Sequence, residues 1–137
     1  MLAANIYQQL ALRTNDGQST ERVHCSIEQF KKWSKDYDKE ELKKGIIYDP
    51  GELLNGALGL TGEAGEVSDI IKKHIFHGHA LNVAELVKEL GDVCWYVSLL
   101  SYAVGYDLSE VMTRNIEKLK ARYPEGFSET MSINRKG

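Results

Sequence analysis

The sequence predicts an all-α fold, a bundle of helices without a β-sheet. Apolar residues recur at steps of three and four residues over most of the chain, which is the period of an amphipathic helix. No stretch shows the alternating apolar and polar pattern of a half-buried strand. Helix-breaking residues stand where the periodic stretches end, at Gly45, Gly78, Gly105 and Pro124. A length of 137 residues is typical of one domain, so we expect residues 1–137 to form a single domain.

The first third of the chain is expected to contain a short helix and a longer, charged helix. The short helix lies around Ile6 to Arg13, and the polar stretch TNDGQSTER that follows has the composition of a loop. Ser26 with Gln29 three residues later has the form of a helix cap. The helix that it opens carries many charges, has few apolar residues and ends at Gly45, so we expect it outside the core or in an oligomer contact.

Three further helices are expected to form the core. The first runs from about Glu52 to Phe76, the second lies between Asn82 and Gly105, and the third between Asp107 and Pro124. The last two each begin with the form of a capping box, in which Glu85 or Glu110 follows the cap by three residues. The predicted buried stripe of the first core helix consists of Leu53, Leu54, Ala57, Leu58, Ala64, Val67, Ile70, Ile71 and Ile75.

Composition and charge argue against several classes of protein. The chain has 17 Lys and Arg against 20 Asp and Glu, a net charge of −3, and no basic stripe, so a nucleic acid polymer is not an expected partner. No apolar run approaches the ~18 residues of a membrane span, and no signal peptide is recognisable. Cys25 and Cys94 lie far apart, and the apolar neighbours of Cys94 predict a buried free thiol. We therefore expect a cytoplasmic protein.

Two pairs of acids stand inside the first two core helices. Glu63 and Glu66 occur in the sequence GEAGE, and Glu89 and Asp92 in KELGD. A spacing of three residues puts each pair on one face of its helix. Carboxylates beside an apolar core repel one another and require a cation. A set of oxygen ligands without Cys or His suits Mg²⁺ or Mn²⁺ better than Zn²⁺.

Glycines stand beside these acids, although glycine weakens a helix. Gly62, Gly65 and Gly91 each cost about 1 kcal/mol relative to alanine. Their small size would let two helices, or a ligand, come close to the backbone. The plain alternative is that the acids lie on solvated helix faces, and the spacing alone leaves that alternative open.

Longer stretches of the sequence resemble a known family. GLTGEAGEVSDIIKK, then KELGDVCWYVSLL, then NIEKLKARYPEGF are similar to the MazG-like members of the all-α nucleoside triphosphate pyrophosphohydrolase superfamily. YQQLALRT near the start and SINR near the end also resemble this family. The region of about residues 15–50 is longer and more charged than the family leads us to expect, which bears on oligomer contacts and base specificity. The resemblance implies a MazG-like helical bundle with a metal site between two long core helices.

The resemblance also implies a reaction and a metal site. Family members hydrolyse a nucleoside or deoxynucleoside triphosphate to the monophosphate and pyrophosphate by attack of water at the α-phosphorus. The four positions of the family's metal motif are Glu63, Glu66, Glu89 and Asp92, with Mg²⁺ as the expected cofactor and Mn²⁺ as a substitute. Either Glu63 or Glu66 is expected to accept the proton of the attacking water.

Several residues are candidates for binding the substrate. The resemblance assigns Asn115 and Lys118 to the nucleotide, and Arg122 lies on the same helical face. Tyr96 is a candidate because it follows Asp92 by one turn. Two further candidates for binding the substrate are Lys73 and Asn55 of the first core helix. For each of these cations the plain alternative is an ordinary surface residue, and for Tyr96 it is a core aromatic.

The resemblance implies a homodimer or homotetramer, and three other functions stay open. One is a phosphoribosyl-ATP pyrophosphohydrolase of the same superfamily. The second is a catalytically silent helical bundle that binds a nucleotide or a protein. The third is a di-iron protein, although Glu21-x-x-His24 supplies one Glu-x-x-His helix where two are needed.

Overall fold

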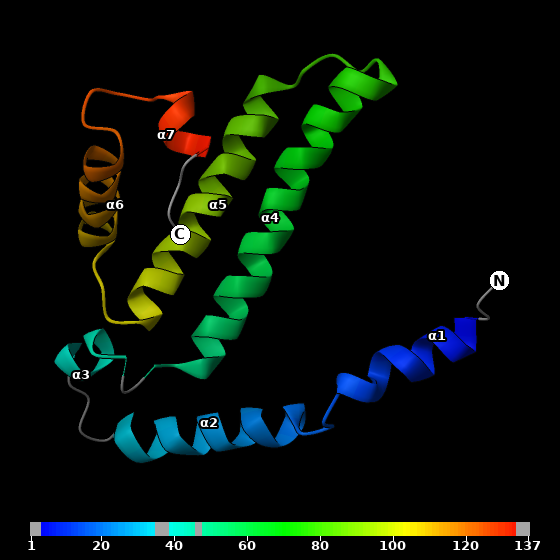
Figure 1. Cartoon of the computed structure of the whole chain (residues 1–137), viewed down its shortest axis with the longest axis vertical. Helices are drawn as coiled ribbons and strands as arrows, with labels where there is room; N and C mark the ends of the chain where they lie inside the picture. Colours follow the sequence, from blue (N-terminus) through cyan, green and yellow to red (C-terminus); the bar gives the residue numbers. More distant parts are fainter. Residues whose placement is uncertain (1–3, 35–38, 46–47, 134–137) are drawn as a thin grey trace. The chain divides into compact units, whose positions relative to one another are not determined.

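The chain is helical throughout the part that the structure describes. The structure is a computed structural model that describes residues 4–34, 39–45 and 48–133. Seven α-helices and one 3-10 helix lie in these ranges, which contain no strand (Figure 1). The all-α prediction is confirmed. The chain divides into two compact units, Met1–Tyr37 and Asp38–Gly137.

The first unit contains α1 (Ala4–Ala11), the 3-10 helix η1 (Leu12–Thr14) and α2 (Ser19–Trp33). The predicted loop is shorter than expected because α2 already begins at Ser19. The Asp16 carboxylate accepts a hydrogen bond from the Gln18 backbone and forms an ion pair with Arg22 in the first turn of α2. These contacts start the helix upstream of Ser26, which lies inside α2, so the cap predicted there is wrong.

The charged helix predicted to end at Gly45 is not one continuous helix. α2 ends at Trp33, and a separate short helix, α3 (Lys39–Lys43), belongs to the second unit. Gly45 has φ +69°, a left-handed conformation that stops a helix.

Two long helices form the centre of the second unit. α4 (Pro50–His77) and α5 (Val83–Ala103) pack side by side and run in opposite directions (Figure 1). Asp49 caps α4, because its Oδ1 accepts hydrogen bonds from the backbone N–H groups of Gly51 at 2.9 Å and Glu52 at 3.2 Å. Gly78 ends α4 in the left-handed conformation, with φ +73°. The predicted first core helix is confirmed to within two residues at each end.

The remaining helices follow the predicted order. Asn82 caps α5 by accepting a hydrogen bond from the Glu85 N–H at 3.1 Å. α6 (Leu108–Arg122) packs on α5, and the short α7 (Glu129–Ile133) follows it. Asp107 is the N-cap residue of α6, as predicted, but its side chain makes no capping hydrogen bond. α7 was not predicted from the sequence.

α4 and α5 approach closely at two glycines near one end of the pair. A methyl group added at Gly56 would lie 2.7 Å from the Leu100 side chain, and one added at Gly59 would overlap the Tyr96 ring. An added methyl group at Gly62, Gly65 or Gly91 would meet no atom within 4 Å. Of the two predicted roles of these last three glycines, close packing of helices is therefore wrong for the described residues. Close approach of a ligand stays a prediction, and the space beside the glycines is open.

Much of the apolar surface of the two long helices is not covered by the described residues. Leu53, Val67 and Ile70 of the predicted stripe are half-buried, but Leu58 is 73% and Ile75 62% exposed. Cys94 is exposed as well, so its predicted burial is wrong for a single chain. Two packed helices bury only the sides that face each other. In the described part of the chain, no helix is both long and apolar enough to cross a membrane.

Candidate active site

Three of the four predicted metal ligands come together between α4 and α5. One carboxylate oxygen from each of Glu63, Glu89 and Asp92 lies within 4.8 Å of the others. Glu89 is buried with 8% of its surface exposed, Glu63 is half-buried and Asp92 is exposed. The cluster therefore has one buried side and one side open to solvent.

The register of the two helices explains why these acids meet. Tyr96 packs against Gly59, and the helices run antiparallel, so one turn forward on α4 faces one turn back on α5. One turn after Gly59 is Glu63, and one turn before Tyr96 is Asp92. The close glycine contact thus brings Glu63 opposite Asp92.

The same register places Glu66 level with Glu89, although Glu66 is not part of the three-oxygen cluster. Glu66 is three residues after Glu63, and Glu89 is three residues before Asp92. The Glu66 side chain is exposed. The pKa of Lys73 is raised first by its hydrogen bond to Asp69, and the negative charge of Glu66 adds to this effect. Glu66 therefore lies beside the cluster of Glu63, Glu89 and Asp92 and is not part of it.

Burial and neighbouring acids give Glu89 an unusual environment. Burial raises the pKa of Glu89, and the hydrogen bond that it shares with Glu85 raises it further. The Lys88 Nζ atom, 3.7 Å from Glu89 Oε1, acts in the opposite direction. A buried carboxylate beside two others is stabilised in its charged form by a cation. The hard oxygen donors of the cluster fit a divalent cation such as Mg²⁺.

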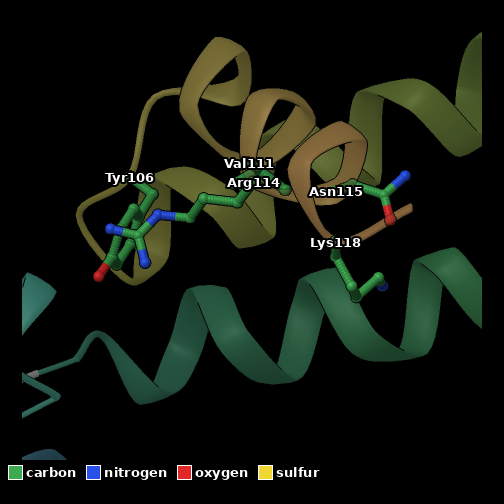
Figure 2. A pocket seen from close by; sticks show the side chains of 5 residues that line it. All are labelled: Tyr106, Val111, Arg114, Asn115 and Lys118. Atoms are coloured by element: carbon green, nitrogen blue, oxygen red, sulfur yellow. The ribbon is translucent and has the colours of Figure 1, made fainter. Parts of the chain in front are cut away.

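A second feature is an open pocket of about 490 Å³ beside α6. It is lined by Tyr106, Val111, Arg114, Asn115 and Lys118 (Figure 2). Two of the predicted substrate-binding residues, Asn115 and Lys118, therefore lie in one pocket. Arg122, the third predicted residue of this helix, is half-buried and does not line it.

Comparison with known proteins identifies the family. Residues 53–127 match the sequence model of the MazG nucleotide pyrophosphohydrolase domain. The chain belongs to this family. It is also similar to the gene 37 protein of Mycobacterium phage L5, with 38% identity over 82 residues that cover 57% of this chain and 72% of that protein. No solved structure matches the chain.

The MazG match points to a nucleotide pyrophosphohydrolase type of enzyme, in a family that is typically metal-dependent. The matched residues contain all of α5 and α6 and most of α4, and with them every candidate site residue. The first unit and α3 lie outside the matched residues. The region that departs from the family, at about residues 15–50, thus lies outside the matched part of the chain.

The other predicted substrate residues of this MazG chain have different surroundings. The Tyr96 ring packs on Gly59 and meets the Trp95 ring edge-on at 4.8 Å, so it also serves the contact between the helices. Lys73 lies 2.6 Å from Asp69, and Lys72 and Lys73 lower the pKa of Asp69 to about 2. Asn55 is exposed on α4.

Three residues that line the pocket were not among the predicted site residues: Tyr106, Val111 and Arg114. Arg114 precedes Lys118 by one turn on the same face, so helical spacing gives a signal for it. Tyr106 lies in the loop between α5 and α6, where no periodicity marks a side chain that faces a pocket.

Proposed function

We propose that this MazG enzyme is a Mg²⁺-dependent nucleoside triphosphate pyrophosphohydrolase. It converts a nucleoside or deoxynucleoside triphosphate to the monophosphate and pyrophosphate by attack of water at the α-phosphorus. The observation that supports this most strongly is the meeting of Glu63, Glu89 and Asp92 within 4.8 Å, in the region that matches the family.

The proposed metal ligands are these three acids together with Glu66. Glu66 completes the set because the helix register puts it level with Glu89. Mg²⁺ or Mn²⁺ bound there supplies positive charge to phosphate oxygens and lowers the pKa of coordinated water. Either Glu63 or Glu66 accepts the proton of the attacking water, since both carboxylates lie on α4 at or beside the cluster.

The proposed substrate contacts come mainly from α6. Lys118 donates its ammonium and Asn115 its amide to the triphosphate from the same pocket. Four further residues keep a proposed place near the substrate: Tyr96, Lys73, Arg122 and Asn55. Lys73 reaches a phosphate only if it leaves Asp69.

The test is hydrolysis of a substrate panel by the purified protein with Mg²⁺, Mn²⁺ or no metal. The panel contains the dNTPs, the NTPs and phosphoribosyl-ATP, and products are separated by chromatography. We expect monophosphate and pyrophosphate to form only with metal. Diphosphate and phosphate as products would contradict attack at the α-phosphorus, and activity on phosphoribosyl-ATP alone would identify the related enzyme.

Matched variants connect the activity to the cluster. Asp92→Asn removes one exposed ligand and is expected to lower kcat at least a hundredfold, about 2.7 kcal/mol of barrier. Glu125→Gln removes an exposed acid beyond α6 and is expected to keep full activity. No hydrolysis by the wild type, with nucleotide still raising the melting temperature, would favour a silent binding protein.

We further propose that the enzyme is a homodimer or homotetramer in which a second copy covers α5. Leu100 of α5 faces α4, yet Val83, Val87 and Leu90, which share another side of the helix, are 59%, 61% and 47% exposed. A helix that is apolar on two sides needs a partner on each. A second copy supplies the same self-complementary surface.

A further inference from the structure

A network of four side chains joins α3 to α6 at the edge of the pocket. The Tyr106 hydroxyl donates a hydrogen bond to the Lys43 carbonyl oxygen at 3.1 Å. The Lys43 ammonium lies 5.7 Å and the Arg114 guanidinium 4.8 Å from the centre of the Tyr106 ring. Glu110 contacts both cations, at 3.3 Å from Lys43 and 3.0 Å from Arg114.

The network orients Arg114 in two ways. Glu110 accepts a hydrogen bond from one guanidinium nitrogen of Arg114, and the guanidinium lies over the Tyr106 ring (Figure 2). A guanidinium has five N–H donors, so this bond leaves most of them for a ligand. The side chain of Arg114 is also 62% exposed, and it lines the pocket together with Asn115 and Lys118.

The residues that line the pocket include two cations, Arg114 and Lys118, and no acid, so the lining suits an anion. Lys43 and Arg114 share the single carboxylate of Glu110, and further acids nearby also act on both cations. Lys118, one turn after Arg114 on α6, forms no ion pair with any residue that the structure describes. Arginine binds phosphate with a planar fork of donors, and an oriented fork loses less freedom on binding.

We propose that Arg114 binds a phosphate group of the nucleoside triphosphate, and that Glu110 and Tyr106 are positioning residues for it. This inference rests on the proposed function and adds a substrate-binding residue to it. Lys43 connects the same network to α3, which lies outside the part of the chain that matches the family. In this proposal α3 supports the substrate pocket through the contacts of Lys43 with Glu110 and Tyr106.

The test compares Arg114→Gln with Lys120→Gln, using the best substrate of the panel. Both variants remove one positive charge from α6, but Lys120 does not line the pocket. We expect Arg114→Gln to raise KM about tenfold, which corresponds to about 1.4 kcal/mol, with kcat changed less than about threefold. Lys120→Gln is expected to keep KM within about twofold.

Inhibition by tripolyphosphate separates a phosphate contact from a base contact. We expect Arg114→Gln to weaken this inhibition about as much as it raises KM. A raised KM with unchanged tripolyphosphate inhibition would contradict the phosphate assignment, and an unchanged KM would overturn the proposal altogether. If the wild type hydrolyses no member of the panel, the proposed function itself fails.

A double-mutant cycle tests the positioning role. Glu110→Gln should raise KM about threefold in the wild-type background and leave KM unchanged in Arg114→Gln. A merely structural role of Glu110 would give additive effects in the two backgrounds, and that result would remove Glu110 from the proposal. Circular dichroism melting of all variants checks that they fold.

Discussion

At the scale of single residues, the contact of Gly59 with Tyr96 decides how the metal site is assembled. The contact fixes the register in which Glu63 faces Asp92. A side chain at position 59 would move the Tyr96 ring or separate the helices. The glycines beside the acids have a different environment, because the space around them is open.

We therefore expect opposite effects from two glycine substitutions on α4. Gly59→Ala should lower the free energy of unfolding by about 1–3 kcal/mol, because the methyl group overlaps the Tyr96 ring. Gly62→Ala should raise it by about 0.5–1 kcal/mol, because alanine favours the helix and meets no atom within 4 Å. Urea unfolding measures both. A stable Gly59→Ala protein with unchanged Mg²⁺ affinity would contradict the proposed register.

The acidic cluster gives a second prediction at this scale, for binding of metal without substrate. Mg²⁺ at ten times its dissociation constant should stabilise the wild type by about 1.4 kcal/mol, since it binds only the folded cluster. Differential scanning calorimetry should show a higher melting temperature with MgCl₂ than with NaCl of equal ionic strength. Glu63→Gln should remove this difference. An equal rise in both proteins would mean that Mg²⁺ acts elsewhere.

At the scale of elements, Glu110 joins α3 to α6 instead of serving a capping box. Arg114 lowers the pKa of Glu110, and Lys43 lowers it further. A carboxyl group whose pKa is lowered on folding stabilises the protein above its unfolded pKa, and this contribution is lost as pH falls through the folded pKa. The attachment of α3 should therefore weaken in acid.

This predicts a pH-dependent effect of Glu110→Gln. The variant should melt at a lower temperature than the wild type at pH 7, and the difference should shrink once pH falls below the ordinary Glu value of 4.5. Thermal melts at a series of pH values measure the difference, with Glu125→Gln as the control. A difference that stays constant down to low pH would show that the charge of Glu110 does not stabilise the attachment.

At the scale of the whole molecule, a single chain leaves much apolar surface in water. Among the described residues the buried apolar side chains are the small ones of Ala103 and Pro50, while Leu58, Val87 and Trp95 are 73%, 61% and 56% exposed. Exposed apolar surface of this kind on both long helices is typical of an oligomer interface. That residues 1–137 act as one MazG-like domain stays a prediction.

The proposed oligomer predicts that charges on α5 separate the subunits. Val87→Asp with Leu90→Asp should shift the protein to the monomer in size-exclusion chromatography with light scattering, because an interface excludes unpaired buried charge. Phe127→Asp changes a 74% exposed apolar residue outside the two long helices and should leave the assembly intact. A wild-type monomer at micromolar concentration would contradict the proposal.

The sequence by itself determined the three long helices of the second unit, α4, α5 and α6, because their signals are local. Period, caps and left-handed glycines place α4 and α5, and the E-x-x-E and E-x-x-D spacing selects the acids before any contact is known. The start of α2 and its separation from α3 were missed, since the contact of Asp16 with Arg22 and the break after Trp33 leave no periodic signal.

Only the tertiary structure decided which acids meet and which cations share a pocket. Helix spacing gives a direction around one helix, but the distance between Glu63 and Asp92 depends on how two helices pack at Gly59. The pairing of Glu110 with Lys43 and Arg114 likewise could not be predicted from the sequence, where the position of Glu110 indicates part of a capping box. Its partner Lys43 is 67 positions away along the chain, so the pairing is a property of the folded protein alone.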